Sequence, residues 1–289
     1  MSNYIKLHKE HFDFKKFIRQ ALAEDVGDGD HTSLSTIPAK NKGKVHLLVK
    51  EDGIIAGIEA ARFIFKQIDK DFKFTELIAD GTAVKKGAVA FTVEGNTQKL
   101  LTTERLVLNV MQRMSGIATH THQLMQLCKG TKAKVIDTRK TTPGFRFFEK
   151  WAVAIGGGAN HRYGLFDMIL IKDNHIDFAG GIVPAIDAAN SYLKKTKRKL
   201  KIEIEVRSLK DIETVLKKGK IQRILIDNFT PGQTKKAVHL INGKYESESS
   251  GGITAKNIKA YSRCGVDYIS IGALTHHVNS LDLSLKAVR

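Results

Sequence analysis

The spacing of hydrophobic and polar positions divides the chain into regions of different predicted structure. In residues 12–25 apolar side chains recur at helical spacing, which predicts an amphipathic helix. Over residues 45–94 short apolar runs alternate with turns, and this pattern predicts antiparallel strands with one or two helices. Helical spacing returns over residues 107–118, where we expect a long helix that is capped by Thr102 and Thr103.

Beyond residue 130 the pattern becomes one of apolar runs that each end in polar or charged side chains. The runs are KVIDTRK, MILIKDN, IEIEVRS, RILIDN and DYISIG. Segments with helical spacing separate most of them, and this alternation predicts βα units around a parallel sheet. We favour a small β/α barrel over a dinucleotide-binding sheet because no GxGxxG motif follows a first strand.

Basic side chains gather in residues 137–175, around the first two of these strand ends. The segment carries Arg139, Lys140, Arg146, His161, Arg162, Lys172 and His175 around three successive glycines. In a β/α barrel the C-terminal ends of the strands form the ligand site. We therefore expect this side of the barrel mouth to hold a small, strongly anionic molecule.

Carboxylates and glycines mark the later strand ends. Glu203 and Glu205 alternate with isoleucines and so share one face of their strand. Glu205 and Asp227, on nearby strands, suggest a pair that binds Mg²⁺ or hydroxyl groups, with salt bridges to Arg139, Lys140 or Lys172 as the alternative. The turn Ser250-Gly251-Gly252 and the later Gly272 offer backbone amides to a phosphate.

Arg105 is a basic residue at the predicted start of the long helix, where a cation opposes the helix dipole. One interpretation is an exposed side chain paired with Glu104 or Asp80. The other is an anion contact at a helix N-terminus, where the amides already favour negative charge. The residues alone leave both open.

Composition adds limits on the class of protein. The chain has 289 residues and a formal net charge of +17, which would attract anionic metabolites, acidic lipid or nucleic acid. We interpret the basic cluster over residues 194–201 as a solvated helix end, since no nucleic-acid-binding motif accompanies it. No apolar run is long enough to span a membrane and the charged N-terminal stretch lacks the features of a secretory signal, so we expect a cytoplasmic protein without a membrane or nucleic-acid partner.

Several motifs carry a resemblance to a known family. The chain resembles nicotinate-nucleotide pyrophosphorylase (carboxylating), also called quinolinate phosphoribosyltransferase, in the segments ALAEDVGDGDHTS, ERLVLNVMQRMSGIAT, DTRKTTPGFRFFEKWAVAIGGGANHRYGL, LIKDNHI, IEIEV, LIDN, SSGGI and GVDYISIGALTH. The resemblance covers nearly the whole chain. It implies an α/β fold with an N-terminal α+β sandwich domain (residues 1–115), a partly open β/α barrel (116–274) and residues 275–289 packing back on the first domain.

The resemblance also implies an activity, partners and site residues. The family transfers a phosphoribosyl group from phosphoribosyl pyrophosphate to quinolinate, with Mg²⁺, to give nicotinate mononucleotide, pyrophosphate and CO₂ in NAD biosynthesis. The resemblance also implies a homodimer, compatible with higher oligomers, in which Arg105 of one subunit reaches the active site of the other. The implied quinolinate contacts are Arg105, Thr138, Arg139, Lys140, His161, Arg162 and Lys172. The implied phosphoribosyl pyrophosphate contacts are Glu205, Asp227, Ser250, Gly251, Gly252 and Gly272, with Glu205 and Asp227 also holding the metal, directly or through water.

Two rival interpretations accompany this one. A ModD-type relative of the same fold, linked to molybdenum transport, keeps a TRK-like motif but loses the lysine segment that Lys172 to His175 preserve here, and it would use another acceptor. A basic nucleic-acid-binding protein is the rival of another class. Two departures from the family pattern, Ser249 and a segment from Glu205 to Asp227 that is one residue longer than usual, lie outside the matched ligands.

Overall fold

The structure is a computed structural model in which residues 10–288 are described. Its internal contacts divide the chain into two compact units. Unit 1 comprises residues 1–122, 141–157 and 277–289, and unit 2 comprises residues 123–140 and 158–276. The predicted barrel domain, 116–274, therefore contains a segment that the contacts assign to unit 1.

Unit 1 is built on a four-stranded antiparallel sheet in the order β12-β1-β5-β3. The C-terminal strand β12 pairs with β1, so the last residues of the chain belong to this sheet. The strands are β1 (Lys42–Val49), β3 (Lys73–Glu76), β5 (Val89–Asn96) and β12 (Leu283–Ala287), with the small pair β2 (Gly53–Ile54) and β4 (Ala83–Val84). The helices are α2 (Phe14–Val26), α3 (His31–Thr36), α4 (Ile58–Ile68), α5 (Thr97–Leu127) and α6 (Arg146–Ile155).

An aromatic cluster explains why residues 141–157 belong to unit 1. Phe147 and Phe148 of α6 are fully buried. The ring of Phe147 stacks on Phe12 at 4.6 Å between centroids, and the ring of Phe148 lies 4.9 Å from Phe17. Buried aromatic pairs of this kind add about 0.5–1.5 kcal/mol each beyond the burial of their area, so the apolar face of α6 fixes the segment to the N-terminal helix.

The long helix α5 begins at Thr97, ahead of the predicted start. Asn96 caps it, because its side chain accepts the N–H of Lys99 at 3.0 Å. The hydroxyls of Thr102 and Thr103 instead donate to carbonyls one turn back within the helix, at 2.9 and 2.7 Å. The predicted threonine caps are therefore wrong, since both side chains bond inside the helix rather than at its end.

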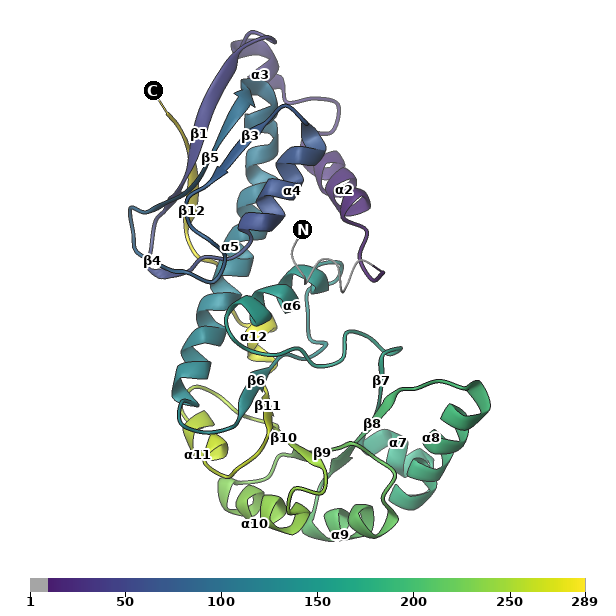
Figure 1. The fold of residues 1–289 in the computed structure, drawn as a ribbon. Coiled ribbons are helices and arrows are strands. Elements are labelled where there is room, and N and C mark those ends of the chain that lie inside the picture. The colour runs from purple at the N-terminus through teal and green to yellow at the C-terminus, as the bar shows by residue number, and fades with distance from the viewer. Residues whose placement is uncertain (1–9, 289) are drawn as a thin grey trace. The chain divides into compact units, whose positions relative to one another are not determined.

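Unit 2 contains a six-stranded parallel sheet in the order β6-β11-β10-β9-β8-β7. This is the cyclic order of a six-stranded barrel in which the pair between β6 and β7 is missing, so the sheet is not closed and the predicted partly open barrel is confirmed. Helices α8, α9, α10 and α11 lie along the outside of the strands (Figure 1). The strands are β6 (Lys134–Ile136), β7 (Met168–Ile171), β8 (Lys201–Val206), β9 (Arg223–Asp227), β10 (Glu246–Ser250) and β11 (Tyr268–Ser270). The helices are α7 (Asp173–Phe178), α8 (Ile182–Thr196), α9 (Leu209–Lys218), α10 (Pro231–Ile241), α11 (Ile258–Ser262) and α12 (Ala273–His276).

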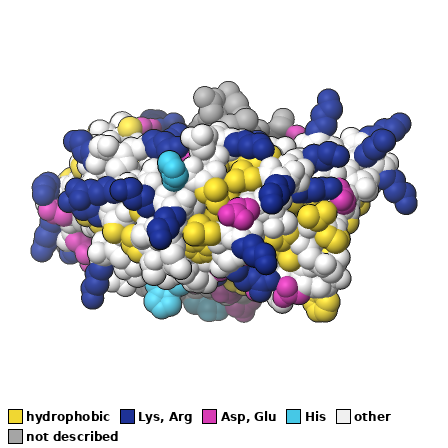
Figure 2. Space-filling view, turned by 90° about the horizontal axis from the view of Figure 1, so that it is seen from below, with side chains coloured by type: hydrophobic (Ala, Val, Ile, Leu, Met, Phe, Trp, Pro, Cys, Tyr) yellow, Lys and Arg dark blue, Asp and Glu magenta, His cyan; other side chains and the backbone are white. Residues whose placement is uncertain are grey.

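Many of the basic side chains of unit 2 lie away from the cavity, on the outer helices and in the loops that join them to the strands. Figure 2 shows Lys and Arg side chains spread over the face that includes α9 and α10. The basic residues of the cluster at 194–201 are all exposed around the end of α8, as expected for a solvated helix end. Among residues 10–288, no helix combines the length and the apolar character that a membrane span requires.

A substitution at Gly116 on α5 can test how tightly unit 1 is packed. A Cβ at this position would lie 2.1 Å from the backbone oxygen of Asn279, in the segment that leads into β12. We predict that Gly116→Ala lowers the free energy of unfolding by at least about 1–3 kcal/mol, because backbone cannot move aside as a side chain can. Gly232→Ala on α10, where a Cβ would meet nothing within 4 Å, should leave the melting temperature unchanged or slightly raised. Equal melting temperatures for the two variants would contradict the close packing at Gly116.

Candidate active site

A cavity of about 810 Å³ lies at the C-terminal ends of the strands of unit 2. Every strand contributes to it, either from its last residues or from the loop that follows. The predicted site residues that line the cavity are Thr138, Arg139, Lys140, His161, Arg162, Lys172, Glu205, Asp227, Ser250, Gly251, Gly252 and Gly272. Its volume lies in the range of small-molecule sites, and parallel pairing has brought together residues more than a hundred positions apart.

Arg105 is the predicted site residue that does not line this cavity. It is exposed on α5 of unit 1, and the helix begins eight residues before it, at Thr97. The idea of an anion contact at a helix N-terminus is therefore wrong, because the helix continues well before Arg105. The predicted alternative was a pairing of Arg105 with Asp80. In the structure the Asp80 carboxylate instead accepts the N–H groups of Ile58 and Glu59 at the start of α4.

The cationic side of the cavity is held in place by its backbone. The N–H of Lys140 donates to the hydroxyl of Thr138 at 3.0 Å, and the Lys140 carbonyl accepts the hydroxyl of Thr275 at 2.6 Å. A Cβ on Gly272 would lie 3.0 Å from Cδ of Lys140, so the lysine side chain passes directly over this glycine. The absence of a side chain at Gly272 thus gives Lys140 its path into the cavity.

Arg139 and Arg162 bring two guanidinium groups to the same wall. The pKa of Arg162 is lowered, first by burial and then by the charge of Arg139, while the nearby Glu203 and Asp167 oppose this effect. The Arg162 Nη1 donates to the carbonyl of Met168 at 3.2 Å, which fixes its direction. Like charges held this close repel each other unless an anion lies between them, so the wall is suited to a multiply charged anion.

Glu205 and Asp227 form the acidic side. The pKa of Glu205 is raised, first by burial and then by the charge of Asp227, whereas Lys172 lowers it. The Asp227 carboxylate accepts the side-chain N–H of Asn228 at 2.6 Å. The repulsion between the two carboxylates would be relieved by a cation or by donor hydroxyl groups, and oxygen ligands of this kind suit Mg²⁺.

The turn after β10 offers open backbone. Ser250 ends the strand, and Gly251 and Gly252 follow with φ of +90° and +61°, a region that favours glycine. A Cβ on Gly252 would meet nothing within 4 Å. At Gly252 a ligand can therefore approach the backbone of this turn without meeting a side chain, which favours phosphate binding.

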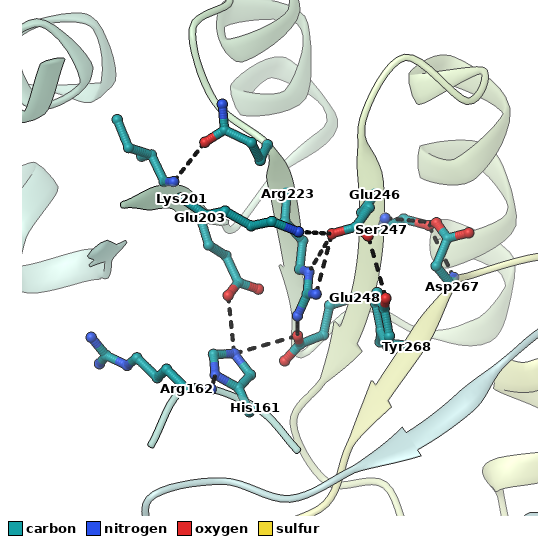
Figure 3. A network of polar contacts seen from close by, with 12 residues as sticks. His161, Arg162, Lys201, Glu203, Arg223, Glu246, Ser247, Glu248, Asp267 and Tyr268 are labelled. Atoms are coloured by element: carbon teal, nitrogen blue, oxygen red, sulfur yellow. Dashed lines mark hydrogen bonds and ion pairs between the residues drawn. The ribbon is translucent and has the colours of Figure 1, made fainter. Parts of the chain in front are cut away.

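Beneath the cavity lies a buried network of His161, Glu203, Glu248 and Arg223 (Figure 3). The Nε2 of His161 is 3.0 Å from Glu203 and 3.5 Å from Glu248. Its Nδ1 accepts the backbone N–H of Arg162 at 2.7 Å. Both ring nitrogens are therefore directed at protein groups rather than at the cavity.

The charges of this network do not balance if both buried acids are ionised. Arg223 contacts Glu248 at 3.1 Å, but it also contacts the partly exposed Glu246 at 3.2 Å. Burial is the main cause that raises the pKa of Glu203 to about 7 and that of Glu248 to about 8. Oε1 of Glu203 and Oε1 of Glu248 are buried without a hydrogen-bond partner among the described groups. A proton on one of the two acids would satisfy them, so we infer that the pair shares a proton at neutral pH.

This network was only partly predicted from sequence. Glu203 and Glu205 do share the buried face of β8, as their alternation with isoleucine indicated. Glu248 was missed, although Glu246 and Glu248 alternate in the same way in ESESS. His161, Glu203 and Glu248 also have the spacing of a metal site, but Arg223 already supplies positive charge to Glu248, and neither Glu205 nor Asp227 belongs to this group.

The fold and the cavity together define a class of protein. A partly open β/α barrel with a cationic wall opposite carboxylates and glycine turns is suited to group transfer between two anionic substrates by positioning and electrostatics. Models of the quinolinate phosphoribosyl transferase N-terminal and C-terminal domains match residues 30–115 and 117–286. The chain belongs to the quinolinate phosphoribosyltransferase family, a family of pentosyltransferases.

Individual relatives agree with this assignment. The chain is 44% identical over 290 residues to "Quinolinate phosphoribosyltransferase [decarboxylating] 1b" of Nicotiana tabacum, covering 95% of this chain and 82% of that one. It is also 44% identical over 290 residues to "Nicotinate-nucleotide pyrophosphorylase [carboxylating], chloroplastic" of Arabidopsis thaliana, covering 95% and 83%. The solved structure of NadC from Streptococcus pyogenes has a TM-score of 0.89 at 36% identity, over 96% of this chain and 97% of that chain.

The shared proton predicts how stability depends on pH. A carboxyl whose pKa is raised by folding binds its proton more tightly in the folded state. Its contribution to stability is present below the unfolded value near 4.5 and is lost as the pH rises through about 7 and about 8. We expect the melting temperature to fall as the pH rises across this window.

Glu248→Gln should reduce this pH dependence, because the amide keeps the shape of the side chain but cannot lose a proton. The relative gain over the wild type at high pH should be on the order of a few kcal/mol, since each unit of pKa shift corresponds to about 1.4 kcal/mol. Glu213→Gln, at an exposed position on α9, is the matched control and should keep the wild-type pH dependence. If Glu248→Gln also keeps it, Glu248 does not hold a proton in the folded protein.

Proposed function

We propose that this protein transfers the phosphoribosyl group of phosphoribosyl pyrophosphate to quinolinate with loss of CO₂, giving nicotinate mononucleotide and pyrophosphate for NAD biosynthesis. Membership of the family supports this reaction. The observation that carries it is the division of the cavity into a cationic wall, suited to a dicarboxylate, and a side with carboxylates and glycine turns, suited to a sugar phosphate. The two substrates of the reaction have these two chemistries.

On the cationic side, Arg139, Arg162 and Lys172 hold the two carboxylates of quinolinate, with Thr138 and Lys140 beside them. Arginine binds carboxylates with paired hydrogen bonds and so fixes the plane of the ring as well as its position. His161 has a different place in this proposal. It accepts the backbone N–H of Arg162 and is backed by the buried acids, so it orients Arg162 from below the cavity.

On the other side, Ser250, Gly251, Gly252 and Gly272 bind phosphate, and Glu205 and Asp227 bind the ribose hydroxyls and Mg²⁺. Two carboxylates in mutual repulsion fit a divalent cation. When bound, Mg²⁺ would neutralise the pyrophosphate as it departs. Glu205 and Asp227 also stabilise the positive charge that develops at C1 of the ribose while the bond to pyrophosphate breaks.

The pyridine nitrogen of quinolinate forms the new bond to C1. The ring nitrogen is then positively charged, and this charge stabilises the electron pair that remains on C2, in the plane of the ring, when the neighbouring carboxylate departs as CO₂. A proton on C2 completes nicotinate mononucleotide. In this sequence the side chains of the cavity act by position and charge, since no covalent intermediate with the protein is needed.

The direct test is to incubate the purified protein with quinolinate, phosphoribosyl pyrophosphate and Mg²⁺ and to measure nicotinate mononucleotide and CO₂. We expect product only when all three are present. Lys140→Ala and Lys172→Ala should each lower kcat/KM by about 10²–10⁴-fold with an unchanged melting temperature, because each removes charge from the positioned substrates. Lys210→Ala, exposed on α9, should have nearly normal activity. Product from nicotinate but not from quinolinate would overturn the choice of acceptor.

We further propose that the protein acts as a homodimer in which Arg105 completes the quinolinate site of the partner. Arg105 and Leu101 are exposed one helical turn apart on α5, a pairing of charge and apolar surface that is typical of contact residues. Near the cavity, Leu165 and Phe166 are 71% and 49% exposed. Such apolar surface beside a charged site favours a covering subunit.

Mixed dimers test this sharing. Arg105→Ala and Lys172→Ala subunits should each be inactive alone, because each lacks one substrate contact. In a verified heterodimer one active site would contain both substitutions and the other would contain neither. We therefore expect about half of the activity of a wild-type dimer. A mixture of Lys140→Ala with Lys172→Ala, both on the same side of the site, is the control and should show no recovery. No recovery in the first mixture would exclude sharing through Arg105.

The cellular location is a separate proposal. We expect the protein in the cytoplasm, because Cys128 and Cys264 are both free thiols, the state that a reducing compartment maintains. Fractionation of the source cells followed by detection of the protein would test this location.

A further inference from the structure

Asn228 lies between the acidic pair and the glycine turn and is not accounted for by the site described so far. It directly follows Asp227, the last residue of β9, and it lines the cavity. Its backbone is left-handed, with φ of +57°, a conformation that costs most residues energy but that Asn and Gly adopt readily. The residue type at this point of the cavity is therefore restricted by the backbone conformation.

The backbone of Asn228 extends the pairing of β9 and β10 by one residue. Asp227 and Ser250 are the last partners in the parallel register. The N–H of Asn228 then donates to the carbonyl of Ser250 at 3.0 Å. The strand that carries the proposed cation ligand is thereby fastened to the strand end that begins the proposed phosphate turn.

The side chain of Asn228 turns back towards Asp227 and occupies the space beside Gly251. Its Nδ2 donates to Oδ2 of Asp227 at 2.6 Å. Its Oδ1 lies only 2.1 Å from where a Cβ of Gly251 would be. Gly251 must therefore lack a side chain for Asn228 to take this position, and the amide in turn lies against the turn after β10.

Asparagine meets these requirements together, and other residue types fail at least one of them. Glycine would accept the backbone conformation but would leave Asp227 without its donor. Aspartate would accept it too, but would place a second negative charge against Asp227. An alanine would lack the donor and would strain at positive φ. The hydrogen bond to Oδ2 fixes the direction of the Asp227 carboxylate and leaves its other oxygen for a ligand.

We propose that Asn228 is a positioning residue for the phosphoribosyl pyrophosphate side of the site, and that it holds the Asp227 carboxylate and the Gly251 turn in register with each other. This inference rests on the proposed function. It predicts that loss of the Asn228 amide weakens the binding of the phosphorylated substrate and its cation but not the binding of quinolinate, whose contacts lie on the cationic wall.

Asn228→Gly is the sharpest variant, because glycine keeps the left-handed backbone and removes only the side chain. The KM for phosphoribosyl pyrophosphate and the Mg²⁺ concentration for half-maximal activity should each rise by about 10-fold or more, in the range seen for residues that orient metal ligands. Added Mg²⁺ should restore part of the loss. Asn228→Asp should show a larger effect. The dissociation constant of quinolinate, measured by calorimetry, should stay within about twofold of the wild type.

Asn242→Gly is the matched control, since Asn242 is also left-handed, with φ of +46°, and exposed at the end of α10. It should leave every one of these quantities unchanged. A second readout does not depend on turnover: Mn²⁺ binding in the presence of phosphoribosyl pyrophosphate, followed by calorimetry, should weaken by about 10-fold in Asn228→Gly alone.

The outcomes separate this inference from the proposed function. If Asn228→Gly binds Mn²⁺ and phosphoribosyl pyrophosphate as the wild type does, or if it loses quinolinate affinity equally, Asn228 is not a positioning residue for this side. If the wild type binds both but forms no product with quinolinate, the proposed function fails, while a weakened Asn228→Gly variant in the Mn²⁺ measurement still supports the role of Asn228.

Discussion

Parallel pairing in a single register is the constraint on which the cavity depends. The strands of unit 2 are largely buried, and each ends in a polar residue or is followed directly by one, so parallel pairing places these polar groups on one edge. The pairs of β8 with β9 and of β9 with β10 bring Glu205, Asp227 and Ser250 onto neighbouring strands. A slip of one residue in the pairing of β8 would turn its buried carboxylates to the opposite face, so the register determines the chemistry as well as the packing.

Like charges lie close together in two parts of the cavity. Arg139 and Arg162 repel each other on one side, and Glu205 and Asp227 repel each other on the other. His161 connects the first of these pairs to the interior, where Glu203 and Glu248 share a proton and Arg223 supplies the balancing charge. Such an arrangement is costly without substrates, and it becomes favourable when anions and a cation occupy the two sides. The preorganised site therefore lowers the stability of the unliganded protein.

The glycines and Asn228 show how closely backbone and chemistry are linked here. Gly272 gives Lys140 its path, and Gly251 makes room for Asn228. Neither position could be read as a packing requirement from the sequence, because the atoms that would clash belong to residues far away in the chain. The sequence predicted both glycines as parts of phosphate-binding turns, but it did not predict that they leave space for other side chains.

Local patterns in the sequence were sufficient to predict which strands carry which functional side chains. They failed where the structure depends on contacts between distant segments. The alternation of IEIEV predicted two carboxylates on one buried face, since a strand has a period of two whatever surrounds it. The predicted caps at Thr102 and Thr103 were wrong because α5 begins earlier, after Asn96. For the same reason the interpretation of Arg105 as a residue at the helix end was wrong. By itself the sequence determined the fold class, the barrel and many of the residues that line the cavity, but not Glu248 or Asn228. Only the tertiary structure decided that residues 141–157 join unit 1, that His161 is directed at Glu203 and Glu248, and that Asn228 lies over Gly251, because each of these depends on contacts between segments that no local period describes.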